Sequence, residues 1–251
     1  MRSSTRTDNA IAMVLVLLGV SLWELAVRVL NVPVYLLPTP SRILQTLFQH
    51  MHLYAQASLL TLGEAVGGLL LGLTTGICAA TLLGLWPRLE RGVMTLAILV
   101  KSTPLVAVAP LLTIWLGFGV LPKVLITALL TFFPVLVNVL SGIQSADGAL
   151  LDTFHSWDAT RWELLLHVRA PSALPHLFAA LKVSAPLALI GAVVAEWTGA
   201  SGGLGRAMWM AYTNLNLPYL FAAVFILAAM GMALYSLVVL LERKTIFWSG
   251  Q

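Results

Sequence analysis

The sequence predicts an all-α, polytopic membrane protein with about six membrane-spanning helices. Of its 251 residues, 59% are hydrophobic and only 10% are charged, whereas soluble domains carry about 25% charged residues. A soluble fold could not hide so much apolar surface. The apolar residues also gather in long runs, and a helix needs about 20 such residues to cross a bilayer.

Six apolar runs are long enough to cross the membrane, and most of them end at proline or glycine. The first is expected to be a retained span, because no small-residue cleavage site of a signal peptide follows it. Pro87 closes the second run, and Gly117 and Gly119 close the third. We expect one transmembrane domain over residues 1–251, with spans near 10–30, 57–85, 92–116, 121–143, 174–198 and 218–241.

The positive charges between the runs predict which side of the membrane each loop faces, since cytoplasmic loops are enriched in Lys and Arg. With the N-terminus inside, the cytoplasmic side holds Arg2, Arg6, Arg88, Arg91, Arg161, Arg169, Arg243 and Lys244. The other side holds Arg28, Arg42, Lys123 and Arg206. We therefore expect both termini in the cytoplasm. Residues 31–56 would lie outside, as an extended entry and a short amphipathic helix.

The residue patterns that enzyme chemistry needs are missing. There is no G-x-x-x-x-G-K-[ST] loop for nucleotide phosphates and no H-E-x-x-H zinc motif. The single cysteine, Cys78, can form no internal disulfide. No set of nucleophile, base and orienting acid is recognisable. We expect no catalytic residue and no metal site. The net charge of +4 indicates cytoplasmic Lys and Arg rather than a nucleic-acid partner.

A polar insert at 150–171 interrupts the apolar runs between the fourth and fifth spans. Its apolar residues recur at roughly helical spacing, so that one face can pack. Thr160 and Glu163 have the spacing of a capping box that starts a short helix, and Pro171 would help to end it. These signals predict a pair of short amphipathic helices at the cytoplasmic surface; the alternative is an interfacial loop that only links two spans. The apolar positions are Leu150, Phe154, Trp157, Leu164, Leu165 and Val168.

The insert also contains a recognisable spacing. Asp152-Thr153-Phe154 is followed by three residues, by Asp158 and, nine residues later, by Val168-Arg169-Ala170-Pro171. This register resembles the signature of the inner-membrane permease subunits of ABC importers, which reads E-A-A, three residues, Gly, nine residues and I-x-L-P. The spacing is kept, although only the proline is identical and Asp158 replaces the glycine.

Other segments resemble one branch of that family, from about residue 15 to residue 247. They are LLPTPSRIL (36–44), VAVAPLLTIWLGFGVLPKV (106–124), FFPVLVN (132–138), DATRWELLLHVRAPSALPHLFAALKV (158–183) and ALIGAVVAEWTGASGGLG (188–205). The branch serves sulfonates, taurine, nitrate, thiamine-precursor pyrimidines and riboflavin.

The resemblance implies a transport subunit that is not itself an enzyme. Two permease copies would pair as a homodimer in the lipid of a bacterial inner membrane, and an external solute-binding protein would deliver the solute. A cytoplasmic ABC ATPase dimer would bind ATP and Mg, so this chain would hold no cofactor. The implied ATPase-coupling residues are Asp152, Thr153, Phe154, His155, Ser156, Trp157, Asp158, Ala159, Thr160, Arg161 and Trp162.

Prolines and polar residues in the third to fifth spans are candidates for the translocation pathway or its gate. Interior prolines favour kinks, and ionisable residues in a span usually face an interior or water. Alternatives stay open: Lys101 can snorkel to the headgroups, Trp115 can be a packing aromatic, and Glu196 can be an interfacial carboxylate. The candidates are Lys101, Ser102, Pro104, Pro110, Trp115, Pro134, Asn138 and Glu196.

The second run carries two more features. Gly68, Gly72 and Gly76 form overlapping G-x-x-x-G steps, which permit close helix contact either at a homodimer seam or within one subunit. Glu64 stands about where relatives tend to have a basic residue, so no inherited role is assigned to it.

Two other functions are possible on the sequence alone. A secondary transporter working without an ATPase would be expected to show broken repeat helices and carboxylates near the midplane. A non-transporting scaffold would not need the register from Asp152 to Pro171. For an importer, GAVVAEWTGASGGLG favours a vitamin precursor such as a thiamine pyrimidine or riboflavin, and the alternative is a sulfonate, taurine or nitrate-type anion.

Overall fold

The computed structural model describes residues 4–246, without the side chains of residues 4–10, 12, 101, 105 and 106. These residues form helices joined by turns, with no strand among them, which confirms the all-α prediction. The chain divides into two compact units, Met1–Gln56 with Ala207–Ile226 and Ala57–Arg206 with Leu227–Gln251. Helices α3 (Met51–Leu85) and α11 (Leu217–Thr245) contribute residues to both units.

The smaller unit contains α1 (Ser4–Val29), α2 (Pro40–Gln49) and most of α10 (Leu204–Thr213). Thr39 caps α2, because its side chain accepts a hydrogen bond from the Arg42 amide. The Glu24 carboxylate of α1 accepts hydrogen bonds from the amide and hydroxyl of Ser41, at 3.0 and 2.7 Å. Tyr54 donates to the Tyr219 carbonyl at 3.0 Å. The short helix predicted within 31–56 is therefore α2.

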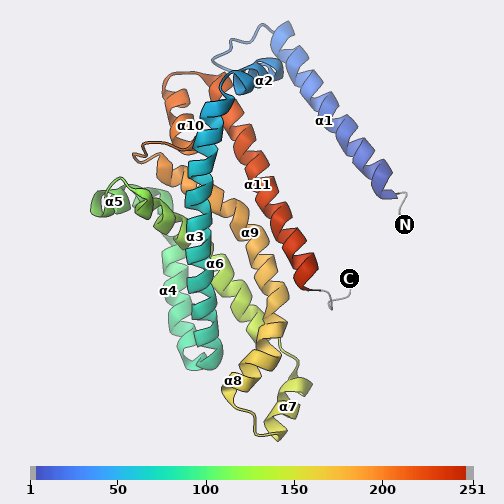
Figure 1. The fold of residues 1–251 in the computed structure, drawn as a ribbon, viewed down its shortest axis with the longest axis vertical. Coiled ribbons are helices and arrows are strands. Elements are labelled where there is room, and N and C mark those ends of the chain that lie inside the picture. Colours follow the sequence, from blue (N-terminus) through green and yellow to red (C-terminus); the bar gives the residue numbers. More distant parts are fainter. Residues whose placement is uncertain (1–3, 247–251) are drawn as a thin grey trace. The chain divides into compact units, whose positions relative to one another are not determined.

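The larger unit contains the remaining helices. In chain order they are η1 (Pro87–Leu89), α4 (Glu90–Ser102), α5 (Leu105–Leu116), α6 (Val120–Gln144), α7 (Gly148–Ser156), α8 (Arg161–Leu164), η2 (Leu165–Arg169) and α9 (Ala170–Glu196). Helices α6 and α9 form the most extensive helix pair and lie side by side in Figure 1. Their buried contacts include Val135, Leu136, Val139 and Ala180. Lys182 and Glu242 pair at 2.8 Å and join α9 to α11.

Glycines on one face of α3 let it approach α6 closely. An added Cβ at Gly68 would lie 2.9 Å from the Val124 carbonyl, and one at Gly76 would lie 3.1 Å from the Phe132 carbonyl. Gly72 and Gly84 meet α6 in the same way, at Thr131 and Ile143. The G-x-x-x-G steps of α3 therefore serve packing within one chain, the second of the two alternatives that the sequence left open.

Four helices among the described residues are long and apolar enough to cross a membrane: Met51–Leu85, Val120–Gln144, Arg161–Glu196 and Leu217–Thr245. The third predicted span, near 92–116, is interrupted at one of the prolines that the sequence placed inside it. Helix α4 ends at Ser102, Thr103 is extended (φ −73°, ψ 129°), and α5 begins at Leu105. Pro104 explains the break, because its ring disfavours helical geometry at the preceding residue.

The α3–α6 contact gives a matched pair of substitutions. Gly68→Ala places a methyl group against Thr127 and the Val124 carbonyl, and such overpacking typically costs about 1–3 kcal/mol. Gly63→Ala meets no atom within 4 Å and should be neutral or slightly stabilising, because alanine favours helices. We expect thermal unfolding of the purified chain in detergent to start at a lower temperature for Gly68→Ala only. Equal unfolding temperatures for the two variants would contradict the close α3–α6 contact.

Candidate functional site

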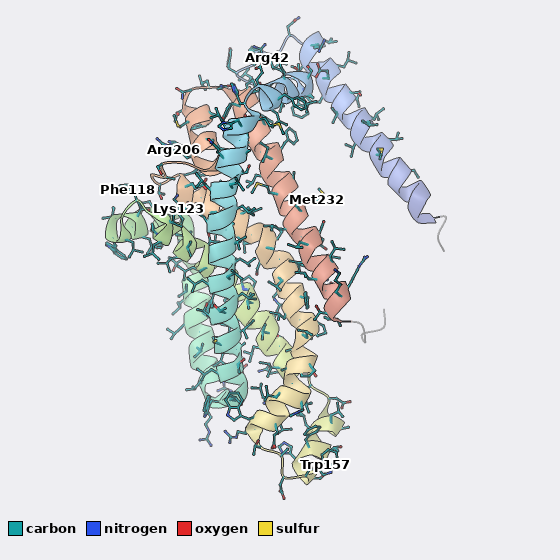
Figure 2. All side chains as sticks on the ribbon, viewed as in Figure 1. Arg42, Phe118, Lys123, Trp157, Arg206 and Met232 are labelled. Atoms are coloured by element: carbon teal, nitrogen blue, oxygen red, sulfur yellow. The ribbon has the colours of Figure 1, made fainter. Side chains whose placement is uncertain are left out.

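The predicted coupling segment folds as two short helices joined by a tight turn. Asp147 caps α7, and its Oδ1 accepts a hydrogen bond from the Ala149 amide at 2.9 Å. Helix α7 ends at Ser156, and the Ala159 amide donates to the Phe154 carbonyl at 3.1 Å across the turn. Figure 2 labels Trp157, which stands in this turn between α7 and α8.

Asp158 has a positive φ of 53°. Glycine adopts this left-handed conformation without steric cost, whereas among other residues Asp and Asn tolerate it best. Asp158 is the residue that stands at the glycine position of the permease signature. The backbone geometry therefore explains why glycine suits this position and why aspartate can replace it.

The second short helix begins at the capping box that the sequence predicts. The Thr160 hydroxyl accepts from the Glu163 amide at 3.3 Å, and the Glu163 carboxylate accepts from the Thr160 amide at 2.7 Å. The two reciprocal bonds satisfy donors that the first turn of a helix leaves without partners.

The prediction that Pro171 ends this helix is wrong. The chain continues from α8 through η2, a five-residue π-helical turn, into α9, so that Arg161–Glu196 counts as one apolar helix. Proline has no N–H and crowds the carbonyl one turn earlier. The widened turn, in which the Ala170 amide donates to the Leu165 carbonyl, lets the helix pass Pro171.

Two arginines attach the segment to the end of α3. Arg169 donates to the Gly84 carbonyl at 2.9 Å, and Arg161 donates to the Leu85 carbonyl at 3.5 Å. The last carbonyls of a helix have no partner within the helix and attract cations. Sequence analysis did not identify this contact, although Arg is common where helix carbonyls need a partner.

The predicted apolar face of the segment is only partly buried. Leu164, Leu165 and Val168 are buried, and the Phe154 ring packs on Trp157 and His167, with centroids 5.6 and 6.3 Å apart. Leu150 and Trp157 were expected to pack in the same face, but both are exposed.

Exposed apolar surface therefore remains on the segment. Trp157 is 71% exposed and Trp162 is 59% exposed, and both belong to the predicted coupling residues. The His155 and Asp158 side chains are exposed as well. Large exposed aromatic residues beside charged ones are typical of protein contact surfaces.

Charged groups gather inside the larger unit, where α3, α6 and α9 meet. The Lys123 ammonium pairs with Oε1 of Glu64, and both side chains are buried. Oε1 of Glu196 accepts a hydrogen bond from the Thr61 hydroxyl at 2.7 Å, and its Oε2 accepts one from the Gly205 amide. Lys123, expected in a loop, is thus a buried partner of the carboxylate that the sequence left without a role. The sequence signal for this ion pair is that Lys123 and Glu64 are isolated, oppositely charged residues in apolar runs.

The Glu196 carboxylate is fully buried beneath the glycine-rich segment that follows α9. A Cβ at Gly203 would collide with the carboxylate, and one at Gly205 would lie 2.8 Å from its Oε2. Gly203 also has a positive φ of 102°. The Leu204 amide donates to the Thr61 hydroxyl at 2.8 Å, which closes the network. Glu196 therefore anchors the 199–205 turn to α3, a structural role that does not depend on contact with solute.

The other predicted pathway residues do not converge on Glu196. Pro110 lies inside α5 and Pro134 inside α6. Asn138 donates to the Pro134 carbonyl at 2.8 Å, and the Ser102 hydroxyl donates to the Ile98 carbonyl at 2.8 Å. Trp115 is exposed, so it is no packing aromatic within this chain. The Lys101 backbone belongs to α4, but its side chain lies outside the described residues.

No group of three or more metal-ligating side chains occurs in the described part of the chain. The fold and these sites define a helical membrane protein. Its apolar helix Arg161–Glu196 begins within the polar, aromatic-rich coupling segment. The chain belongs to the family described as the binding-protein-dependent transport system inner membrane component, whose model matches residues 68–247. It is a transmembrane permease of the ABC transporter class.

Several curated relatives match nearly the whole chain. The formylaminopyrimidine transport permease protein ThiX of Halalkalibacterium halodurans is 34% identical over 234 residues, 90% of this chain and 91% of the relative. The riboflavin transport system permease protein RibX of Chloroflexus aurantiacus is 35% identical over 230 residues, which cover 91% of this chain and 86% of the relative. The taurine transport system permease protein TauC of Escherichia coli is 29% identical over 244 residues, which cover 91% of this chain and 86% of the relative.

Solved structures share the fold. An inward-facing structure of the MetNI methionine ABC transporter superimposes with a TM-score of 0.70 at 18% sequence identity, covering 78% of this chain and 97% of that chain. The predicted permease family is therefore confirmed by sequence and the helical fold by structure.

Substitutions at Asp158 test the turn geometry. Asp158→Gly should leave local stability unchanged or raise it, because glycine has no side-chain cost at positive φ. Asp158→Val should destabilise the turn by about 1–2 kcal/mol. That cost would speed amide hydrogen exchange of residues 152–163 about five- to thirty-fold. Hydrogen exchange followed by mass spectrometry measures both variants, and wild-type exchange rates in Asp158→Val would contradict the left-handed conformation.

Proposed function

We propose that the chain is the permease subunit of an ATP-driven importer, and that residues 152–162 receive the movement of a separate ATPase. One observation carries this proposal. The helix that starts at Arg161, within the coupling segment, runs to Glu196 without a break in its helical path. A force applied at the exposed Trp157 and Trp162 would act on a membrane-spanning helix directly.

We propose three partners for the chain. A cytoplasmic ABC ATPase dimer binds ATP and Mg, and this chain holds no cofactor. Two copies of the chain form the membrane part, and an external solute-binding protein delivers the solute. The family description as a binding-protein-dependent system supports these partners. The family description as an inner membrane component supports a bacterial inner-membrane location, and the excess of Lys and Arg on one side supports an orientation with both termini in the cytoplasm.

The break between α4 and α5 and the prolines inside α5 and α6 support a pathway wall in this region. Pro104, Pro110 and Pro134 would let the wall bend, and Ser102, Trp115 and Asn138 are proposed to face the solute. Lys101 remains a proposed pathway residue on sequence grounds.

For the solute we propose a heterocyclic vitamin precursor, such as a thiamine pyrimidine or riboflavin. The resemblance to ThiX, a formylaminopyrimidine permease, and to RibX, a riboflavin permease, at 34% and 35% identity supports this choice. A sulfonate is the second candidate, supported by TauC at 29% identity. The glycine-rich 199–205 turn, which belongs to the segment GAVVAEWTGASGGLG, is built around Glu196 rather than open to a ligand, so it does not decide between them.

The coupling role predicts how Trp162 behaves. Trp162→Ala removes a ring from a residue that is 59% exposed, so the permease should fold and assemble with the ATPase. We expect ATP hydrolysis to lose its stimulation by the loaded binding protein and solute uptake to fall at least tenfold in proteoliposomes containing the whole complex, a cost of about 1.4 kcal/mol or more.

Charge reversals provide the matched control. Arg161→Glu lies in the coupling segment and should uncouple hydrolysis from uptake, whereas Arg42→Glu reverses an exposed charge on α2 and should leave both unchanged. Normal uptake by a correctly assembled Trp162→Ala or Arg161→Glu complex would refute the coupling assignment.

The choice of solute is tested on the binding protein that works with this permease. Calorimetric titration with a formylaminopyrimidine, riboflavin and taurine should give tight binding for one of the two heterocycles. Tight binding of taurine alone would favour the sulfonate alternative.

A further inference from the structure

A cavity of about 380 Å³ lies where the end of α3 faces the segment from α7 to η2. We call it the basic cavity, since Arg88, His155, Arg161 and Arg169 all line it. Trp86 and Pro87 form part of its wall.

The charge in the basic cavity is one-sided. Three guanidinium groups and one imidazole line it, and no carboxylate does. Arg161 and Arg169 spend one hydrogen bond each on the carbonyls of Leu85 and Gly84, which leaves several of their N–H donors available. Arg88 is exposed and forms no ion pair within the described part of the chain.

Converging guanidinium groups without a counter-charge suit one class of ligand. Their planar donor pairs match the oxygens of phosphate, and such charge-assisted hydrogen bonds are about twice as strong as neutral ones. We propose that the basic cavity binds a phosphate group, carried either by a phospholipid headgroup or by a soluble phosphate compound.

The position of the cavity favours the lipid. It lies at the C-terminal end of α3, where the apolar run stops at Trp86 and is followed by Arg88 and Arg91, the pattern expected of a helix that emerges at the headgroups. Trp86, 49% exposed, stands directly after α3, and tryptophan concentrates at headgroup depth. The bound phosphate would hold the end of α3 to Arg161 and Arg169, beside the coupling turn.

The test uses the full-length chain, purified in a neutral detergent and stripped of lipid. Native mass spectrometry measures retention of phosphatidylglycerol and of diacylglycerol with the same acyl chains. Only phosphatidylglycerol should be retained by the wild type. Arg88→Gln should weaken its retention about tenfold or more, the loss expected for one hydrogen bond to a charged group. Arg91→Gln removes an equal exposed charge three residues away, outside the cavity lining, and should have no effect.

Inorganic phosphate distinguishes the two sources. If millimolar phosphate raises the unfolding temperature of the wild type but not of Arg88→Gln and displaces the lipid, the ligand is a soluble phosphate compound. If phosphate does neither, the ligand is the lipid. The proposal is overturned if Arg88→Gln and Arg91→Gln lose phosphatidylglycerol equally, or if neither probe binds the wild type.

Discussion

The close contact of α3 with α6 is the constraint on which the larger unit depends. In a membrane the apolar side chains of neighbouring helices gain little from leaving lipid, so association rests on close packing and on interhelical hydrogen bonds. Gly68, Gly72 and Gly76 provide the close packing, with α6 carbonyls and side chains where a Cβ would otherwise stand. Helix α9 in turn packs along α6, so the position of both ends of α9 follows from this contact.

A different set of hydrogen bonds connects α3 to α9 at each end of the pair. At one end Thr61, Glu196 and the amides of Leu204 and Gly205 form a buried network. At the other end Arg161 and Arg169 bind the last carbonyls of α3. Unpaired polar groups are costly in an apolar medium, so both connections should resist separation. The proposed coupling follows from this arrangement, because a helix held at both ends transmits a displacement instead of absorbing it.

The sequence predicted the features that depend on local chemistry. Helical class, the capping box at Thr160 and the short helix after Pro40 all follow from composition and spacing. The end predicted at Pro171 and the unpredicted Lys123–Glu64 pair both depend on tertiary structure, which local sequence patterns do not contain. Pro104 interrupts the third apolar run directly after Lys101, Ser102 and Thr103, while Pro171 does not break a helix, because a π turn absorbs it. Composition cannot distinguish these two prolines. The Lys123–Glu64 pair joins residues 59 positions apart, and no spacing rule reaches across two helices.

The central claim is that this permease moves its solute only when a separate ATPase drives it. Proteoliposomes containing the permease, its ATPase and the loaded binding protein test this directly, by uptake of labelled solute with ATP inside, with a non-hydrolysable ATP analogue inside, and with the ATPase omitted. The account predicts uptake in the first preparation alone, whatever proton or sodium gradient is imposed. Gradient-driven uptake by the permease without the ATPase would contradict it and identify a secondary transporter.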